Sequence, residues 1–99
     1  MSRITAAITA VGAFVPEYRL TNAILETMVD TNDEWITTRT GIKERRILKD
    51  KNKGTSYLAI KAAEDLIEKH NIDPAEIDMV LLGTATPDMP VASTAVYVA

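Results

Sequence analysis

The chain contains no cysteine, and this absence removes several kinds of chemistry at once. Without cysteine, its 99 residues hold no disulfide, no thiolate nucleophile and no cysteine-ligated metal site. Aromatic residues make up only 5% of the sequence, and there is one tryptophan and one histidine. Residues 43–53, the most basic stretch, contain no aromatic residue, so the interleaved cations and aromatics of a nucleic-acid surface are missing.

Long apolar runs and a strong net charge are also missing. No run approaches the length needed to span a bilayer, and the N-terminus lacks the apolar core of a signal peptide. A net charge of -3 gives no bulk attraction to nucleic acid or to an anionic membrane. With 46% hydrophobic and 25% charged residues, the composition is typical of a folded cytoplasmic protein. We therefore expect a cytoplasmic location, with neither nucleic acid nor membrane as a partner.

The first half of the chain predicts short elements separated by turns. Alternation over residues 4–15 favours a strand that ends at Pro16. Thr21 or Asn22 can cap a short helix that runs through Asp30. Residues 31–34 have the spacing of a capping box, which predicts a second helix.

The second helix should carry Trp35 and end at Gly41 in a left-handed turn. Residues 42–48 alternate apolar and charged side chains, as an exposed strand does, and residues 50–54 form a polar loop. Thr55 or Ser56 should then cap the clearest amphipathic helix.

That long helix should continue to about His70 and stop at Asn71, with a single helical turn at residues 73–76. Residues 79–85 form a continuous apolar run, typical of a parallel strand covered on both faces. The loop at residues 86–90 would follow the carboxyl end of that strand, where α/β proteins usually place ligands. These patterns predict an α/β fold.

Trp35 and Arg39 are four residues apart, so a helix places them on the same face. An indole can stack on a base, and a guanidinium can hold a phosphate by charge-assisted hydrogen bonds. The pair therefore suits a nucleotide. Taken alone, Trp35 is more often a core or interface residue, and Arg39 could pair with Asp33 or Glu34 at the surface.

The wording around this pair is more specific than its spacing. Asp-Glu-Trp-Ile at residues 33–36, Thr-Arg-Thr-Gly-Ile at 38–42 and Glu-Arg-Arg at 44–46 closely resemble the opening of the β-ketoacyl-acyl-carrier-protein synthase III family. The resemblance continues in order from Ile4 to the end of the chain. It implies an α/β, thiolase-like fold, with five αβαβα layers and a homodimer in the full-length protein. The apolar tail after Pro90 agrees with an incomplete N-terminal half-domain over residues 1–99, with the remainder of the protein missing.

The resemblance also implies an activity, because the family starts fatty-acid synthesis. Its members transfer an acyl group from acyl-coenzyme A to an active-site cysteine and condense it with malonyl-acyl-carrier-protein. Coenzyme A is then part of a substrate rather than a permanently bound cofactor, and no metal is implied. The family's catalytic cysteine, histidine and asparagine have no counterpart in this chain, so the chain alone is expected to be inactive.

Four residues can be carried over from the family. Trp35 matches a tryptophan that stacks on adenine, Thr31 a threonine that hydrogen-bonds adenine, and Arg39 an arginine that reaches the phosphates. Met89 falls where the family has a residue that lines the acyl pocket of the partner subunit. Thr31 keeps a second interpretation, because its hydroxyl could instead cap the helix.

The basic segment leaves further alternatives open. Seven of the eleven cations lie between residues 39 and 53: Arg39, Lys43, Arg45, Arg46, Lys49, Lys51 and Lys53. They could attract an acidic carrier protein or phosphates, or form a solvated face, and Arg45 and Arg46 could touch ligand or only hold the segment in place. The alternative functions are a synthase III-like enzyme of secondary metabolism and a free-standing binding domain that docks through this segment.

Overall fold

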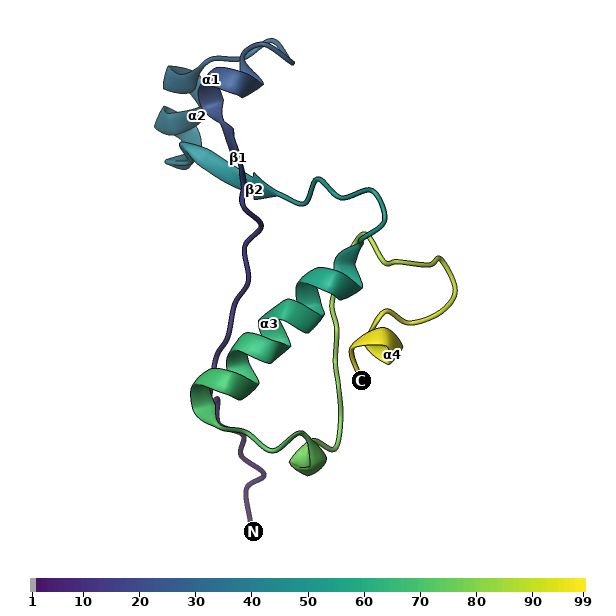
Figure 1. Cartoon of the computed structure of the whole chain (residues 1–99). Helices are drawn as coiled ribbons and strands as arrows, with labels where there is room; N and C mark the ends of the chain where they lie inside the picture. Colours follow the sequence, from purple (N-terminus) through teal and green to yellow (C-terminus); the bar gives the residue numbers. More distant parts are fainter. Residues whose placement is uncertain (1) are drawn as a thin grey trace. The chain divides into compact units, whose positions relative to one another are not determined.

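The computed structural model describes residues 2–99, which form two compact units (Figure 1). One unit is continuous and spans Val15–Asn52. The other joins the residues before it, up to Phe14, to Lys53–Ala99. The two units are described separately below.

The unit Val15–Asn52 is built on a two-stranded antiparallel sheet. Its elements are β1 (Tyr18–Thr21), α1 (Asn22–Leu25), α2 (Asp33–Thr40) and β2 (Glu44–Ile47). Tyr18 lies opposite Ile47, and Thr21 lies opposite Glu44. The sheet therefore brings the residue before α1 next to the segment that follows α2.

Side-chain caps set where the two short helices begin. Thr21 caps α1 by accepting a hydrogen bond from the backbone N–H of Ile24 at 3.3 Å. Asn32, not Thr31, caps α2, and its side chain accepts from the N–H of Trp35 at 2.8 Å. The predicted start of this helix at Thr31 was therefore one residue early. Gly41 ends α2 with a φ of 72°, in the left-handed turn that was predicted.

The second unit is organised around the long helix α3 (Thr55–His70), which ends at Asn71 with a φ of 51° as expected. The 3-10 turn η1 (Pro74–Glu76) and the short helix α4 (Ala95–Val98) follow it. Gly12 lies directly against α3, because an added Cβ would come within 2.6 Å of the backbone nitrogen of Leu66. A larger residue at this position would push the N-terminal segment away from the helix.

Two hydrogen bonds hold the N-terminal segment beside α3. The N–H of Ala13 donates to the Asp65 carboxylate at 3.0 Å, and the His70 ring lies 3.1 Å from the carbonyl oxygen of Val11. The His70 side chain thus forms a hydrogen bond to a segment that is distant in the sequence, in addition to lying at the C-terminal end of α3.

The two strands predicted at residues 4–15 and 79–85 were wrong, and the strand β1 was not predicted. Both segments run without regular secondary structure beside α3 (Figure 1). A strand is defined by its hydrogen-bonded neighbours, and the described part of the chain provides no neighbouring strand for either segment. The helix expected through Asp30 is also shorter, since α1 ends at Leu25.

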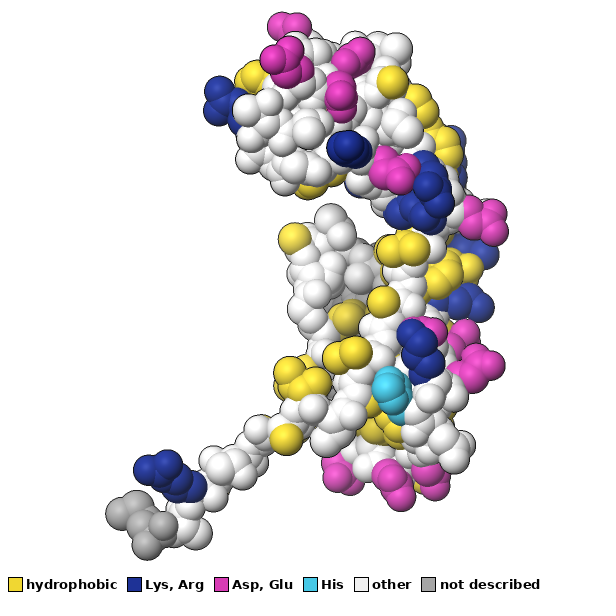
Figure 2. Space-filling model, turned by 90° about the vertical axis from the view of Figure 1, so that its left-hand side faces the viewer, with side chains coloured by type: hydrophobic (Ala, Val, Ile, Leu, Met, Phe, Trp, Pro, Cys, Tyr) yellow, Lys and Arg dark blue, Asp and Glu magenta, His cyan; other side chains and the backbone are white. Residues whose placement is uncertain are grey.

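Many apolar side chains in the second unit remain open to solvent. Leu81 is 86% exposed, and Val91, Val96 and Met79 are also exposed. A hollow of about 480 Å³ is lined by residues of α3, of the segment 74–81 and of the chain end at α4, and its lining is mainly apolar. Figure 2 shows hydrophobic side chains at the surface among the charged ones. None of the helices within residues 2–99 combines the length and apolar character needed to cross a membrane.

We predict that the 99-residue chain, produced alone, self-associates. Its segments expose many large apolar side chains, and exposed apolar surface promotes association in water. Light scattering combined with urea titration checks this prediction. A monomer with one steep, cooperative unfolding transition would contradict it.

Candidate functional site

The helix α2 brings together two of the predicted site residues. The Cζ atom of Arg39 lies 4.7 Å from the centroid of the Trp35 ring, within the range of a cation–π contact. Trp35, the only tryptophan of the chain, is 53% exposed, whereas tryptophan side chains are highly buried on average. The indole is therefore accessible to a ligand and is covered by a cation on part of its surface.

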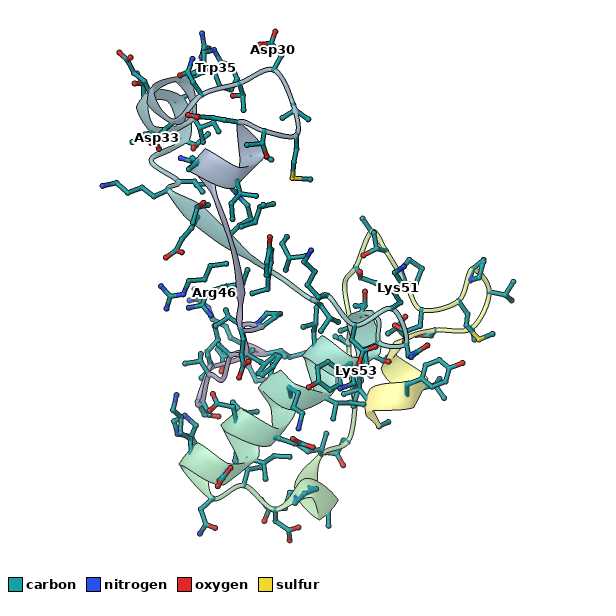
Figure 3. The ribbon with its side chains drawn as sticks, turned by 45° about the horizontal axis from the view of Figure 1, so that its top comes forward. Asp30, Asp33, Trp35, Arg46, Lys51 and Lys53 are labelled. Carbon is teal, nitrogen blue, oxygen red and sulfur yellow. The ribbon has the colours of Figure 1, made fainter. Side chains whose placement is uncertain are left out.

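Thr31 joins Trp35 at a hollow of about 510 Å³. Leu25, Val29 and Ile36 give this hollow an apolar wall, and Asp30 and Asn32 add polar groups. Figure 3 shows Trp35 and Asp30 at the same end of the unit. A flat ring could pack here on the indole, with the Thr31 hydroxyl at its edge.

Arg39 lines a second hollow, of about 310 Å³, on the same helix. Trp35 and Asn32 line both hollows, and Glu34 and Thr38 complete the second one. The arrangement offers an aromatic surface and a threonine on one side and a guanidinium on the other. It could hold a molecule that joins a flat base to an anionic group.

The structure bears on two of the simpler roles that the sequence left open for Thr31 and Arg39. Because Asn32 caps α2, the Thr31 hydroxyl is not needed as a cap. Arg39 contacts the Trp35 ring, whereas the Asp33 carboxylate bonds to Asn22 and Thr37. The ligand roles of Thr31, Trp35 and Arg39 remain predictions.

The buried amide of Asn22 fixes α2 on the sheet, and sequence reasoning missed this role. Asn22 is 2% exposed, and its Nδ2 donates to the Asp33 carboxylate at 2.7 Å and to the carbonyl of Ile42 at 2.9 Å. Its Oδ1 accepts from the Arg45 guanidinium at 2.9 Å. One side chain thereby joins the start of α2, the segment after α2, and β2.

Arg45 and Arg46 hold the segment in place through internal bonds. Arg45 also donates to the carbonyl of Leu20 at 3.1 Å, and Arg46 donates to the carbonyl of Pro16 at 2.8 Å. Both guanidiniums thus bind backbone oxygens of the segment that contains β1. Of the two roles left open for this pair, these contacts support the structural one.

Asp33 adds an electrostatic component to this network. Hydrogen bonds from Asn22 and then Thr37 lower the pKa of its carboxyl below the ordinary value of 3.8, and the charge of Lys43 acts in the same direction. Because the folded-state pKa is lowered, the ionised contact stabilises the fold above pH 3.8 and is lost as pH falls below that value. The carboxylate is therefore charged throughout the neutral range.

Met89, the fourth predicted site residue, belongs to the other unit. It is half exposed, and its sulfur accepts a hydrogen bond from the Tyr97 hydroxyl at 2.9 Å. The predicted loop at residues 86–90 is present. The role of Met89 in the acyl pocket of a partner subunit remains a prediction.

Comparisons with known proteins identify what this chain resembles. A curated β-ketoacyl-[acyl-carrier-protein] synthase III of Porphyromonas gingivalis W83 is 65% identical over all 99 residues. The crystal structure of 3-oxoacyl-[acyl-carrier-protein] synthase III from Aquifex aeolicus matches with a TM-score of 0.81 and 47% identity, over 90% of this chain and 28% of that one. The priming β-ketosynthase of the R1128 polyketide pathway matches with a TM-score of 0.80 and 32% identity, over 90% of this chain and 26% of that one.

These matches confirm the predicted resemblance and the fold class. The chain is similar over its whole length to β-ketoacyl-acyl-carrier-protein synthase III, and its α/β structure is part of a thiolase-like fold. It spans about 30% of the length of the curated relatives it matches. No protein-family model matches the chain.

We predict that Asn22→Ala loosens α2 in the full-length protein. The substitution removes the hydrogen bonds of a buried amide to Asp33, to the Ile42 carbonyl and from Arg45, and leaves Asp33 with the bond from Thr37. Loss of this buried amide should cost about 2 kcal/mol. Amide hydrogen exchange over residues 33–41 should then accelerate roughly thirty-fold. Asn52→Ala, in the polar loop, is the control and should leave exchange in α2 unchanged. Equal exchange in both variants would show that the Asn22 network does not hold the helix.

Proposed function

We propose, from the sequence and fold shared with β-ketoacyl-acyl-carrier-protein synthase III, that α2 binds the nucleotide end of acyl-coenzyme A. The observation that carries the proposal is the half-exposed indole of Trp35, with a hollow beside Thr31 and a hollow beside Arg39. Coenzyme A combines a purine with several phosphates, so it has one chemical group for each part of this surface.

Each residue would recognise a different part of the ligand. Trp35 would stack on the adenine, and stacking on an aromatic surface contributes about 1–3 kcal/mol per base. The Thr31 hydroxyl would hydrogen-bond the edge of the base, and Arg39 would hold a phosphate by charge-assisted bonds. Since Arg39 already lies 4.7 Å from the indole centroid, the base would use the part of the ring that the guanidinium leaves uncovered.

The reaction proposed for the full-length protein follows from the same family resemblance. A cysteine would take the acyl group from acyl-coenzyme A and release free coenzyme A. The acyl-enzyme would then condense with malonyl-acyl-carrier-protein, with loss of carbon dioxide and release of the cysteine thiolate. A thiolate suits this step because it attacks a thioester readily and forms a new thioester. This chain contains no cysteine, so its own residues would bind and orient the substrate. The full-length enzyme would act as a homodimer.

One observation supports a role in secondary metabolism as an alternative to fatty-acid synthesis. The priming β-ketosynthase of a polyketide pathway shares the fold of this chain at a TM-score of 0.80. A priming enzyme of secondary metabolism is therefore the alternative to an enzyme that starts fatty-acid synthesis. The two alternatives share the acyl-coenzyme A site and differ in the acyl group and the carrier protein.

A free-standing domain that docks through its basic segment has weaker support. Arg45 and Arg46 donate to backbone oxygens within their own unit. The Nζ atoms of Lys49 and Lys53 lie 4.3 Å from the ring centroids of Tyr18 and Tyr57. Much of the positive charge is thus engaged in contacts within the chain.

We expect Trp35→Ala and Arg39→Ala to weaken acyl-coenzyme A binding in the full-length enzyme without slowing its chemistry. Neither side chain would touch the reacting thioester, so the KM for acetyl-coenzyme A should rise while kcat stays nearly unchanged. The KM for malonyl-acyl-carrier-protein should change less, because that substrate has no adenine. Steady-state kinetics with each substrate varied separately measures these effects.

The dependence on salt concentration should distinguish the contribution of Arg39 to acyl-coenzyme A binding from that of Trp35. The loss caused by Arg39→Ala should shrink as ionic strength rises, whereas the loss caused by Trp35→Ala should persist. Asn52→Ala, in the polar loop and in the lining of neither hollow, is the control, because it removes neither a ring nor a charge. A fall in kcat for Trp35→Ala with an unchanged KM for acetyl-coenzyme A would instead make the tryptophan a structural residue.

We propose that Met89 helps to set the preferred acyl group, as the family resemblance implies. Its half-exposed side chain is flexible and polarisable, and Pro87 and Pro90 stiffen the loop around it. In the full-length enzyme, Met89→Phe should narrow the pocket and shift use towards shorter acyl groups. Relative rates with acetyl-coenzyme A and longer acyl-coenzyme A substrates measure this shift, and unchanged relative rates would exclude the role.

A further inference from the structure

The first turn of α3 is capped by a residue from a distant part of the chain. Thr55 and Ser56, expected as caps, lie inside the helix, and Gly54 at the cap position has no side chain to offer. The Asp88 carboxylate takes this role instead, 32 residues further along. Its Oδ1 accepts from the backbone N–H of Ser56 at 2.8 Å, and its Oδ2 accepts from the Ser56 hydroxyl.

The loop around Asp88 is held by two further hydrogen bonds. The Thr55 hydroxyl donates to the carbonyl of Thr86, and the N–H of Asp88 donates to the Thr94 hydroxyl at 3.2 Å. Thr94 is only 3% exposed. Asp88 is thus fixed at its side chain by α3 and at its backbone by the residue that precedes α4.

Gly54 makes room for this contact. A Cβ added to Gly54 would lie 3.2–3.3 Å from the Asp88 carboxylate, tighter than most real contacts of that kind. The two hydrogen bonds from Ser56 lower the pKa of the Asp88 carboxyl, so they favour the charged form. A carboxylate is also favoured by the positive end of the helix dipole.

Met89 follows Asp88 directly in the chain, so fixing the backbone of Asp88 restricts where the backbone of Met89 can lie. We propose that Asp88 is a positioning residue that holds the backbone of the Met89 loop at the start of α3 and thereby sets the acyl-group preference of the full-length enzyme. This inference rests on the proposed function of Met89. Asp88 itself would contact neither substrate nor the reacting atoms.

The test compares acyl-group preference in variants of the full-length enzyme. Asp88→Ala removes both contacts with Ser56, and the ratio of kcat/KM for acetyl-coenzyme A to that for hexanoyl-coenzyme A should change by about tenfold. Asp88→Asn keeps an oxygen that can accept from the Ser56 N–H, so it should retain most of the original ratio. The KM for malonyl-acyl-carrier-protein should stay the same in both variants.

Asp65→Ala is a matched control on the same helix. Asp65 also accepts a hydrogen bond from the backbone of a distant segment, Ala13, and its pKa is also lowered. Its loss should reduce stability without moving the acyl-group ratio. A change of the same size in Asp65→Ala and Asp88→Ala would overturn the proposal, since the effect would then be a general loss of stability.

Met89→Phe, measured in parallel, separates this inference from the proposed function. If Met89→Phe shifts the ratio and Asp88→Ala does not, the positioning role of Asp88 is wrong. If Met89→Phe leaves the ratio unchanged, the proposed role of Met89 fails, and with it the basis for positioning. If Asp88→Ala does not fold, Ser56→Ala takes its place, with a smaller shift expected in the same direction and no shift overturning the proposal.

Discussion

The buried amide of Asn22 is the interaction on which the candidate site depends. It is almost fully withdrawn from water, and its hydrogen bonds run to Asp33, Ile42 and Arg45. A buried amide is costly unless its donors and acceptor are paired, and here they are. The geometry of α2, and so the direction in which Trp35 and Arg39 project, depends on one small polar network rather than on a large apolar core.

The other unit also depends on a polar contact between distant segments, because the cap of α3 does not come from a neighbouring residue. Asp88 caps α3 from a distance, and Gly54 leaves the space that this requires. Few side chains in the described chain are fully buried, so hydrogen bonds between distant segments carry much of the order. The family resemblance associates α2 and the loop at residues 86–90 with substrate, and each is held by hydrogen bonds from a polar side chain to a distant part of its own unit.

Local chemistry explains what could be predicted from the sequence. The stops at Gly41 and Asn71 and the amphipathic helix α3 depend on residues within a turn or two of each other. The strands at residues 4–15 and 79–85 were predicted wrongly. Their apolar patterns are typical of strands that pair with neighbours, and residues 2–99 offer no neighbouring strand to either segment. Asn22 gave no signal, since its partners lie 11, 20 and 23 residues away. Thr31, Trp35 and Arg39 were identified by the family wording, and the structure gathers them around two adjoining hollows.

We propose that Trp35 and Arg39 of α2, together with Thr31 just before the helix cap, bind the nucleotide of coenzyme A. A crystal structure of the full-length protein with coenzyme A tests it most directly. We expect the adenine to pack on the Trp35 ring, with the Thr31 hydroxyl at the edge of the base and Arg39 within hydrogen-bonding distance of a phosphate. A nucleotide bound elsewhere, with Trp35 covered by other parts of the protein, would contradict the claim.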